Sequence, residues 1–122
     1  MNTMIAAHGP SPITRPDGTT VWRTHGGSIH RADGPAIIHP DGSLEWWVHG
    51  NLHRVGGPAA TRPNGIEEWW FHGNLHRVGG PAVTWPDGSL EWHEHGVRKE
   101  PEVEAVLTML WRARTEDSEA SK

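Results

Sequence analysis

The chain alternates apolar and polar residues in short runs that are separated by regularly spaced turn signals. Units that begin at Pro16, Pro40, Pro63 and Pro86 follow one another along the sequence, and the last one is cut short. Alternation with a period of two is typical of strands that pack one face and expose the other. The repeated pattern therefore predicts a mainly β fold, an antiparallel meander of tandem hairpins of about 23 residues with two strands per repeat.

Two turn signals bound the strands of each repeat. The first is Pro-Asp-Gly or Pro-Asn-Gly, in which proline fixes its φ angle and glycine accepts a positive one. The second is a His-Gly pair, whose four copies begin at His25, His49, His72 and His95. Histidine is among the few residues with a side chain that are enriched at positive φ. We therefore expect each of these histidines at the tip of a two-residue type I′ turn.

The His-Gly turns also predict which residues pair across each hairpin. Counting outward from the second turn pairs Val48 with Asn51, Trp47 with Leu52, Trp46 with His53 and Glu45 with Arg54. The last of these pairs and its copy, Glu68 with Arg77, are predicted cross-strand ion pairs. One slot holds tryptophan in all four repeats and is the expected packing face: Trp22, Trp46, Trp69 and Trp92. The next slot varies and is expected to face solvent or a partner: Arg23, Trp47, Trp70 and His93.

The segment that follows the repeats has a helical period. Its apolar residues form one stripe: Val103, Val106, Leu107, Leu110 and Trp111. We expect residues 1–14 to form an N-terminal segment, 15–100 four hairpin repeats with the last one partial, 101–114 a C-terminal helix that caps the sheet, and 115–122 a disordered polar tail. A partner-binding or dimerising helix is the alternative for 101–114.

Composition narrows the functional classes. The formal net charge of −4 argues against a basic nucleic-acid surface and against a polybasic membrane anchor. No stretch of the sequence approaches the roughly 20 apolar residues of a membrane-spanning helix, and the N-terminal residues lack the pattern of a signal peptide. We therefore expect a cytoplasmic protein with neither a nucleic acid nor a membrane as partner. Cysteine is absent, which excludes disulfides and thiolate chemistry.

Ten histidines raise the question of a metal site. Zinc ligands lie about 2.0–2.1 Å from one ion, whereas equivalent histidines of successive repeats are two strands, roughly 9–10 Å, apart. Alternation places only His93 and His95 on one side of a strand. A catalytic pair is also not evident, because Glu45 and Glu68 recur as a ladder and are not differentiated. The sequence therefore predicts a protein that is not an enzyme and has no metal or cofactor.

The variable slot is the best candidate for binding. Trp47 and Trp70 would lie side by side, one repeat apart, and tryptophan and arginine contribute most to the energy of protein interfaces. The candidate binding residues are Trp47, Trp70, Arg54, Arg77, Glu45, Glu68, Arg23 and His93. The alternative is that both tryptophans pack in a second layer or under the C-terminal helix.

The repeats resemble those of the MORN family, whose unit is a β-hairpin of similar length. The stretch from Trp47 to His53 and its copy from Trp70 to His76 are similar to the family's Trp-x-x-Gly-x-x-His core, and the Pro-Asp-Gly turns to its linking turn. The resemblance covers residues 16–100. The family's glycine after that histidine is Arg54 or Arg77 here, and its early Tyr-x-Gly is replaced, which makes this a divergent variant.

The resemblance implies binding and scaffolding, with no catalytic residue. MORN-like units occur in membrane-associated scaffolds and in bacterial proteins described as antitoxins. We therefore expect a bacterial or phage protein-binding module with an antitoxin, immunity or anti-defence role, and a toxin or defence component as its partner. One alternative is a nucleotide or glycan bound on Trp47 and Trp70 with Arg54 and Arg77. Another is self-assembly into a scaffold or virion, or a homodimer, through a sheet edge or the C-terminal helix.

Overall fold

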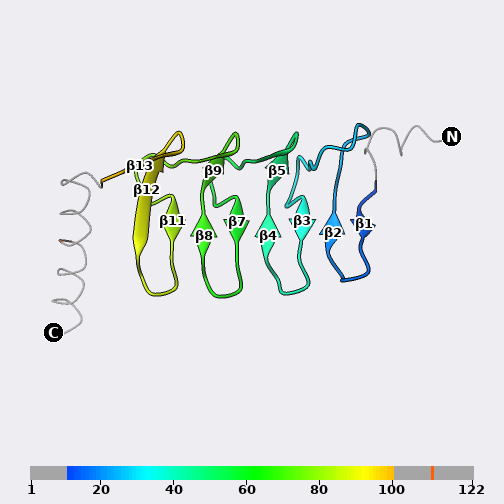
Figure 1. Cartoon of the computed structure of the whole chain (residues 1–122), viewed down its shortest axis with the longest axis horizontal. Coiled ribbons are helices and arrows are strands. Elements are labelled where there is room, and N and C mark those ends of the chain that lie inside the picture. The colour runs from blue at the N-terminus through cyan, green and yellow to red at the C-terminus, as the bar shows by residue number, and fades with distance from the viewer. Residues whose placement is uncertain (1–10, 101–110, 112–122) are drawn as a thin grey trace.

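A computed structural model describes residues 11–100 and Trp111, and within them the chain is an antiparallel meander (Figure 1). The strands are β1 (Ile13–Thr14), β2 (Thr20–Val21), β3 (Ile37–Ile38), β4 (Leu44–Glu45), β5 (Trp47–Val48), β6 (Asn51–Leu52), β7 (Ala60–Thr61), β8 (Glu67–Glu68), β9 (Trp70–Phe71), β10 (Asn74–Leu75), β11 (Val83–Thr84), β12 (Leu90–Glu94) and β13 (Val97–Lys99). The prediction of a mainly β fold built from antiparallel hairpins is confirmed.

Nine of these strands form one sheet, in the order β1-β2-β3-β4-β7-β8-β11-β12-β13. The others form two short ladders, β5 with β6 and β9 with β10. Figure 1 shows the proline-containing turns at the lower ends of the strands. The hairpins that carry the His-Gly turns lie at the opposite, upper ends, and we call them the upper hairpins. The second and third repeats therefore each contribute a pair of sheet strands and one hairpin beyond them.

The proline-containing turns are fixed by side-chain and backbone hydrogen bonds. The N–H of Gly42 donates to the carbonyl oxygen of His39 at 3.0 Å, and Gly42 has a φ of 92°. Asp41 Oδ1 accepts the backbone N–H of Ser43 at 2.8 Å. This hydrogen bond holds the pKa of Asp41 below its usual value. Such Asx turns explain why Asp or Asn recurs between the proline and the glycine.

The upper hairpins have the predicted register. Trp47 lies opposite Leu52, and Trp70 lies opposite Leu75. The turn-tip histidines His49, His72 and His95 have φ angles of 46°, 49° and 50°. His25 differs: it is not among the residues with positive φ, and the extra Gly27 takes that conformation at 97°. The prediction of a type I′ tip is therefore wrong for the first repeat, where an added glycine removes the strain from histidine.

Replacing His72 by valine is expected to cost about 1–2 kcal/mol of unfolding free energy, because a β-branched residue is strained at positive φ. Replacement by asparagine should cost much less, since asparagine tolerates this conformation. Urea denaturation of both variants measures the difference. His25→Val is the control, because His25 lies outside the positive-φ set. Equal losses for His72→Val and His72→Asn would contradict the backbone explanation.

The buried interior consists of small and β-branched residues, and the tryptophans of the recurring slot are half-buried above it. The buried hydrophobic residues among those described are Val21, Ala36, Ile37, Ala59, Ala60, Ala82 and Val83. The half-buried rings of Trp22, Trp46 and Trp69 are each covered by a guanidinium group, that of Arg31, Arg54 or Arg77, at 4.0, 3.9 and 3.8 Å from the ring centre. The tryptophans of this slot are thus covered by arginine side chains as well as packed on the sheet.

Each of these arginines is held from the other side by the loop that follows it. Arg54 Nη1 donates to the carbonyl oxygen of Pro58 at 3.1 Å. A Cβ on Gly57 would lie 2.9 Å from Arg54 Cζ, so the guanidinium occupies the space that a side chain would need. We call each set of tryptophan, arginine and glycine an Arg–Trp clamp: Trp22–Arg31–Gly34, Trp46–Arg54–Gly57 and Trp69–Arg77–Gly80.

The ends of the chain bear on two further expectations. The helix predicted for 101–114 and the tail at 115–122 lie outside the described residues, apart from Trp111, which has a helical backbone and is 68% exposed. The sheet begins with β1 at Ile13, inside the predicted N-terminal segment. Within the described ranges, the structure has no helix with the length and apolar character needed to cross a bilayer.

Candidate binding face

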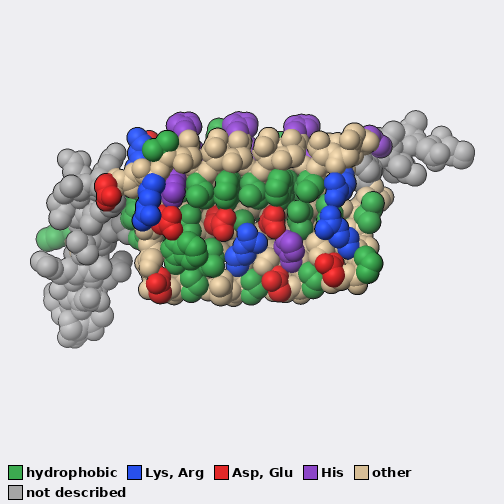
Figure 2. All heavy atoms as spheres, in the orientation of Figure 1, with side chains coloured by type: hydrophobic (Ala, Val, Ile, Leu, Met, Phe, Trp, Pro, Cys, Tyr) green, Lys and Arg blue, Asp and Glu red, His purple; other side chains and the backbone are tan. Residues whose placement is uncertain are grey.

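One face of the main sheet carries a row of glutamates. Residues directly opposite each other on neighbouring strands share a face, and one such row runs through Val21, Ile37, Glu45, Ala60, Glu68, Val83 and Glu91. Figure 2 shows this row of acidic side chains between an apolar row and a row of mixed basic and apolar side chains. We call this surface the acidic face.

Each glutamate of this row accepts a hydrogen bond from the side chain two residues later, which alternation puts on the same face of the sheet. Trp47 Nε1 donates to Glu45 Oε1 at 2.9 Å, and Trp70 Nε1 donates to Glu68 Oε1 at 2.8 Å. In the last repeat His93 takes the place of tryptophan, with Nε2 at 3.1 Å from Glu91 Oε1. In the last three repeats the variable slot therefore holds ring N–H groups, each oriented by a carboxylate.

A second set of donors reaches the same carboxylates from the residue that precedes each turn proline. His39 Nε2 lies 2.5 Å from Glu45 Oε2, and Trp85 Nε1 donates to Glu91 Oε2 at 2.6 Å. The hydrogen bonds from His93 and Trp85 hold the pKa of Glu91 below its usual value. Glu91 is thus an ionised anchor for the two aromatic rings that bond to it.

Arg62 occupies this position at the end of the second repeat, between two carboxylates. Its Nη1 lies 3.6 Å from Glu45 Oε2, and its Nη2 lies 3.8 Å from Glu68 Oε2. The sequence analysis did not select His39, Arg62 or Trp85 as site residues. The signal that identifies them is their shared position directly before a proline-containing turn.

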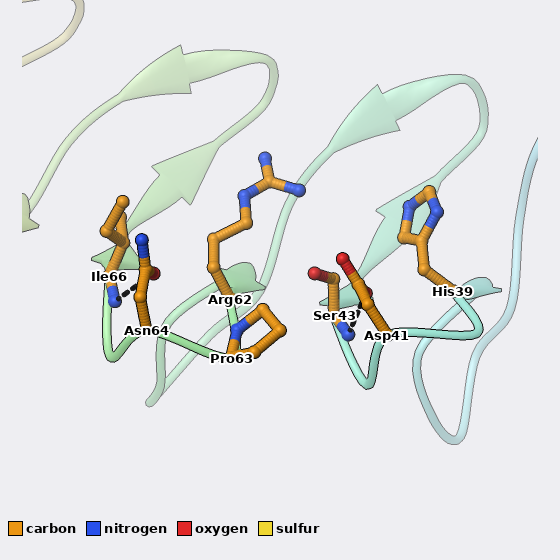
Figure 3. Close-up of a pocket in the computed structure, with 7 residues that line it drawn as sticks. All are labelled: His39, Asp41, Ser43, Arg62, Pro63, Asn64 and Ile66. Atoms are coloured by element: carbon orange, nitrogen blue, oxygen red, sulfur yellow. Dashed lines mark hydrogen bonds between the residues drawn. The ribbon is translucent and has the colours of Figure 1, made fainter.

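A hollow of about 450 Å³ lies on the acidic face between two of the proline-containing turns. Figure 3 shows Arg62 and His39 above it and Asp41 beside Ser43 at its base. The remaining lining residues are Pro63, Asn64 and Ile66. The hollow is open to solvent and mixes a cation, an anion and apolar carbon atoms, which suits a polar group of a docked partner.

The predicted ion pairs of Glu45 with Arg54 and of Glu68 with Arg77 are not formed. The glutamates are bound to Trp47 and Trp70, and the arginines stack on Trp46 and Trp69. The reason is that the predicted ladder ends early: the Arg54 N–H donates at 3.1 Å to the carbonyl oxygen of Trp70 in the next repeat. Extending the hairpin register to Arg54 was therefore wrong.

The structure divides the predicted binding residues between the two faces. Trp47, Trp70, Glu45, Glu68 and His93 gather on the acidic face. Alternation from Val21 puts Arg23 on the same side, where its Nη1 donates to the carbonyl oxygen of Gly27 at 3.0 Å. Arg54 and Arg77 belong to the Arg–Trp clamps on the opposite face, so they do not lie beside Trp47 and Trp70.

Histidines of neighbouring repeats form pairs that the sequence analysis missed. Nδ1 of His30, His53 and His76 accepts the backbone N–H of the turn-tip histidine 19 residues later, at 3.0, 2.9 and 2.9 Å. The two rings of each pair lie 4.2–4.4 Å apart. We call them histidine locks: His30–His49, His53–His72 and His76–His95. Burial, followed by the neighbouring His72, lowers the pKa of His53.

The histidines are not arranged as metal ligands in the part of the chain that the structure describes. No group of three or more His, Cys, Asp or Glu side chains there could hold one ion. His93 is directed to Glu91, and His95 belongs to a histidine lock with His76. Although alternation puts His93 and His95 on one side of the strand, their rings are not directed to a common metal position.

No protein-family model, curated protein or solved structure matches this chain. The acidic face presents Trp47 and Trp70 in the same orientation, each fixed through its ring nitrogen to a glutamate of the same repeat.

Proposed function

We propose that the chain is a non-enzymatic, MORN-like repeat module that binds another protein through its acidic face. The observation that carries this proposal is the repeated Trp–Glu arrangement, in which Trp47 and Trp70 are half-buried and fixed in orientation. Fixed aromatic rings lose little conformational entropy on binding, and tryptophan is enriched among the residues that dominate interface energy. The polar residues around the hollow would form the hydrated rim of the interface.

Repetition favours binding over catalysis. A general acid and a general base need different environments, which push their pKa values apart. Here Glu45, Glu68 and Glu91 share one contact, since each accepts a hydrogen bond from the ring two residues later. A repeated surface of this kind suits an extended contact with a second macromolecule.

The resemblance of the repeats to MORN units favours an antitoxin, immunity or anti-defence role. In this role the module would act by covering a functional surface of a toxin or defence protein. A C-terminal helix over 101–114 would cap the end of the sheet beyond β12 and β13, and so keep that edge from pairing with other chains. This role rests on fold analogy, and the Trp–Glu geometry supports the more general function of protein binding.

Replacing both Trp47 and Trp70 by alanine is expected to weaken capture of the natural partner at least about tenfold, because two interface aromatics are lost. Affinity capture from the source cells, followed by titration of the recovered partner, measures the change. Val55→Ser/Val78→Ser is the matched control, since these valines are 77% and 75% exposed in the loops after the clamp arginines. Equal affinity of the tryptophan variant and wild type would remove the acidic face from the proposal.

A small ligand is the second candidate, and the hollow beside Arg62 favours it. A nucleotide or glycan there would contact Arg62 and His39, whereas Arg54 and Arg77 are held in the clamps. Titration of tryptophan fluorescence with a panel of nucleotides and oligosaccharides separates the two candidates. Saturable quenching that Arg62→Ala abolishes would favour the small ligand over a protein partner.

A further inference from the structure

Negative charge predominates on the acidic face. Besides the central glutamates, the proline-containing turns present Asp17, Asp41 and Asp87, and Figure 2 shows acidic side chains both in the middle of the face and along the turn edge. Hydrogen bonds from Thr19, Ser43 and Ser89 lower the pKa of these three aspartates, so they remain ionised near neutral pH. A partner that docks here must supply compensating positive charge.

Glu68 has the least satisfied carboxylate of the central row. Its Oε1 accepts the N–H of Trp70 at 2.8 Å, but the nearest cation to Oε2 is Arg62 Nη2 at 3.8 Å. By contrast, Oε2 of Glu45 and Oε2 of Glu91 have donors at 2.5 and 2.6 Å. Glu68 can therefore accept a further hydrogen bond from outside the molecule, directly beside the ring of Trp70.

An indole ring next to a carboxylate that can accept a hydrogen bond suits a guanidinium group, which can stack on the ring and donate to the oxygen at the same time. The same molecule already stacks Arg31, Arg54 and Arg77 on tryptophans of its other face, at 3.8–4.0 Å. We propose that the acidic face binds an arginine-rich segment of the partner protein, with one guanidinium stacked on Trp70 and bonded to Glu68.

The spacing of the repeats indicates the form of that segment. Trp47 offers a second indole ring for stacking two strands away, which is roughly 9–10 Å at ordinary strand spacing, although its Glu45 is already bonded to His39. Side chains seven residues apart on an α-helix are about 10.5 Å apart and lie on the same side. A helix with arginines at seven-residue intervals, laid across the strands, would place one arginine at each indole ring.

This inference rests on the proposed function, and a peptide titration tests it separately. The probe is a helical peptide with arginines seven residues apart, added to the full chain at low ionic strength while the indole N–H signals are followed by NMR. We expect saturable shifts of the Trp70 signal and no binding of the same peptide with glutamates in place of arginines. Trp70 shifts that are absent, or that are equal with the glutamate peptide, would overturn the proposal.

Neighbouring glutamates provide a matched pair of variants. Glu68→Gln keeps an oxygen acceptor for Trp70 but loses the charge, and we expect about threefold to tenfold weaker binding of the arginine peptide. Glu67→Gln removes the same charge from the exposed residue before it, which alternation puts on the opposite face. It should change binding less than about twofold. Equal effects of the two variants would show attraction by net charge alone and would overturn the assignment of the face.

The two experiments fail in different ways. If the Trp47→Ala/Trp70→Ala variant loses its natural partner but the arginine peptide does not bind to the wild type, the acidic face still binds protein and only the arginine-rich partner is rejected. If the tryptophan variant keeps its partner and the peptide does not bind, the proposed function is rejected with it.

Discussion

Replacing Gly80 by alanine is expected to lower the unfolding free energy by about 2 kcal/mol, the sum of a partly exposed cation–π contact and a charged hydrogen bond. A Cβ at this buried position would lie 2.7 Å from Arg77 Cζ. The guanidinium would have to leave the ring of Trp69, 3.8 Å below it, and release the carbonyl oxygen of Pro81. Urea denaturation followed by tryptophan fluorescence measures the loss.

A double-mutant cycle with Arg77→Ala separates this explanation from ordinary backbone effects. If the clamp is the cause, Gly80→Ala should cost little in the Arg77→Ala background, because the space is already empty. Gly26→Ala is the matched control: it lacks a positive φ, and the nearest atom to its Cβ would be Thr24 Oγ1 at 3.8 Å. Additive losses from Gly80→Ala and Arg77→Ala would mean that the steric conflict is not what makes glycine necessary.

The Arg–Trp clamps show where strand alternation stops predicting contacts. The register from Trp47 and Val48 to Leu52 and Asn51 follows directly from the His49–Gly50 turn and is found as predicted. Beyond His53 the chain leaves the ladder, and Arg54 bonds to the next repeat through its N–H. Strand alternation assigns side chains to faces within one hairpin, so it does not predict that the backbone of Arg54 bonds to another repeat.

From sequence alone, the Gly56-Gly57-Pro58 stretch indicates only a break in the ladder, because proline has no N–H to donate. The structure gives separate reasons for its residues. Gly56 has a φ of 82°, Gly57 has no room for a side chain beside Arg54, and the carbonyl oxygen of Pro58 receives the arginine. These reasons depend on a side chain that folds back over its own loop, which neither turn propensity nor hydrophobic pattern encodes.

Part of the candidate site could be predicted, because the residue type in its slot varies from repeat to repeat while the scaffold positions stay constant. The variable slot did identify Trp47, Trp70 and His93, which lie on one face. Arg54 and Arg77 were added because arginine is common in interfaces, but both are committed to the clamps. Their constancy in successive repeats is better explained by the scaffold, whereas Arg62, which differs from its counterparts His39 and Trp85, lies on the acidic face.

Comparing only equivalent histidines of successive repeats hid the histidine locks. Equivalent residues are two strands apart, but a lock joins the histidine that ends one hairpin to the turn-tip histidine of the next, 19 residues later. The turn-tip position was explained from sequence by its positive φ. The role of the other histidine, His30, His53 or His76, could be seen only in the structure, because it accepts the N–H of a residue in another repeat.

Lowering the pH from 7.5 to 5 is expected to reduce the unfolding free energy by up to about 2 kcal/mol, since the hydrogen bonds that His30 and His53 accept, of roughly 1 kcal/mol each, are lost. In every lock Nδ1 must be unprotonated to accept the turn-tip N–H. A proton on Nδ1 of His30 or His53 removes the acceptor and puts a positive charge on a ring 4.2 or 4.4 Å from that of the facing histidine. Urea titrations at successive pH values measure the loss.

The direction of this effect follows from the pKa values of His30 and His53. Burial, with a smaller contribution from the facing histidine, lowers both pKa values from the ordinary 6.5. The unfolded chain therefore binds protons first as the pH falls. Stability is greatest above pH 6.5 and declines until the pH has passed the lowered pKa of the folded state. The pKa of Glu91 is lowered from 4.5, so this carboxylate titrates below the same window.

Asparagine substitutions isolate the locks from other titrating groups. The side-chain oxygen of asparagine can take the place of Nδ1 and does not titrate in this range. The double variant His30→Asn/His53→Asn should therefore have lower stability at pH 7.5 but lose much less of it than the wild type down to pH 5. His25→Asn is the control, because no hydrogen bond or ring contact involves His25 in the described residues. A double variant that retained the wild-type slope would place the pH dependence in other groups, and the locks would be neutral with respect to pH.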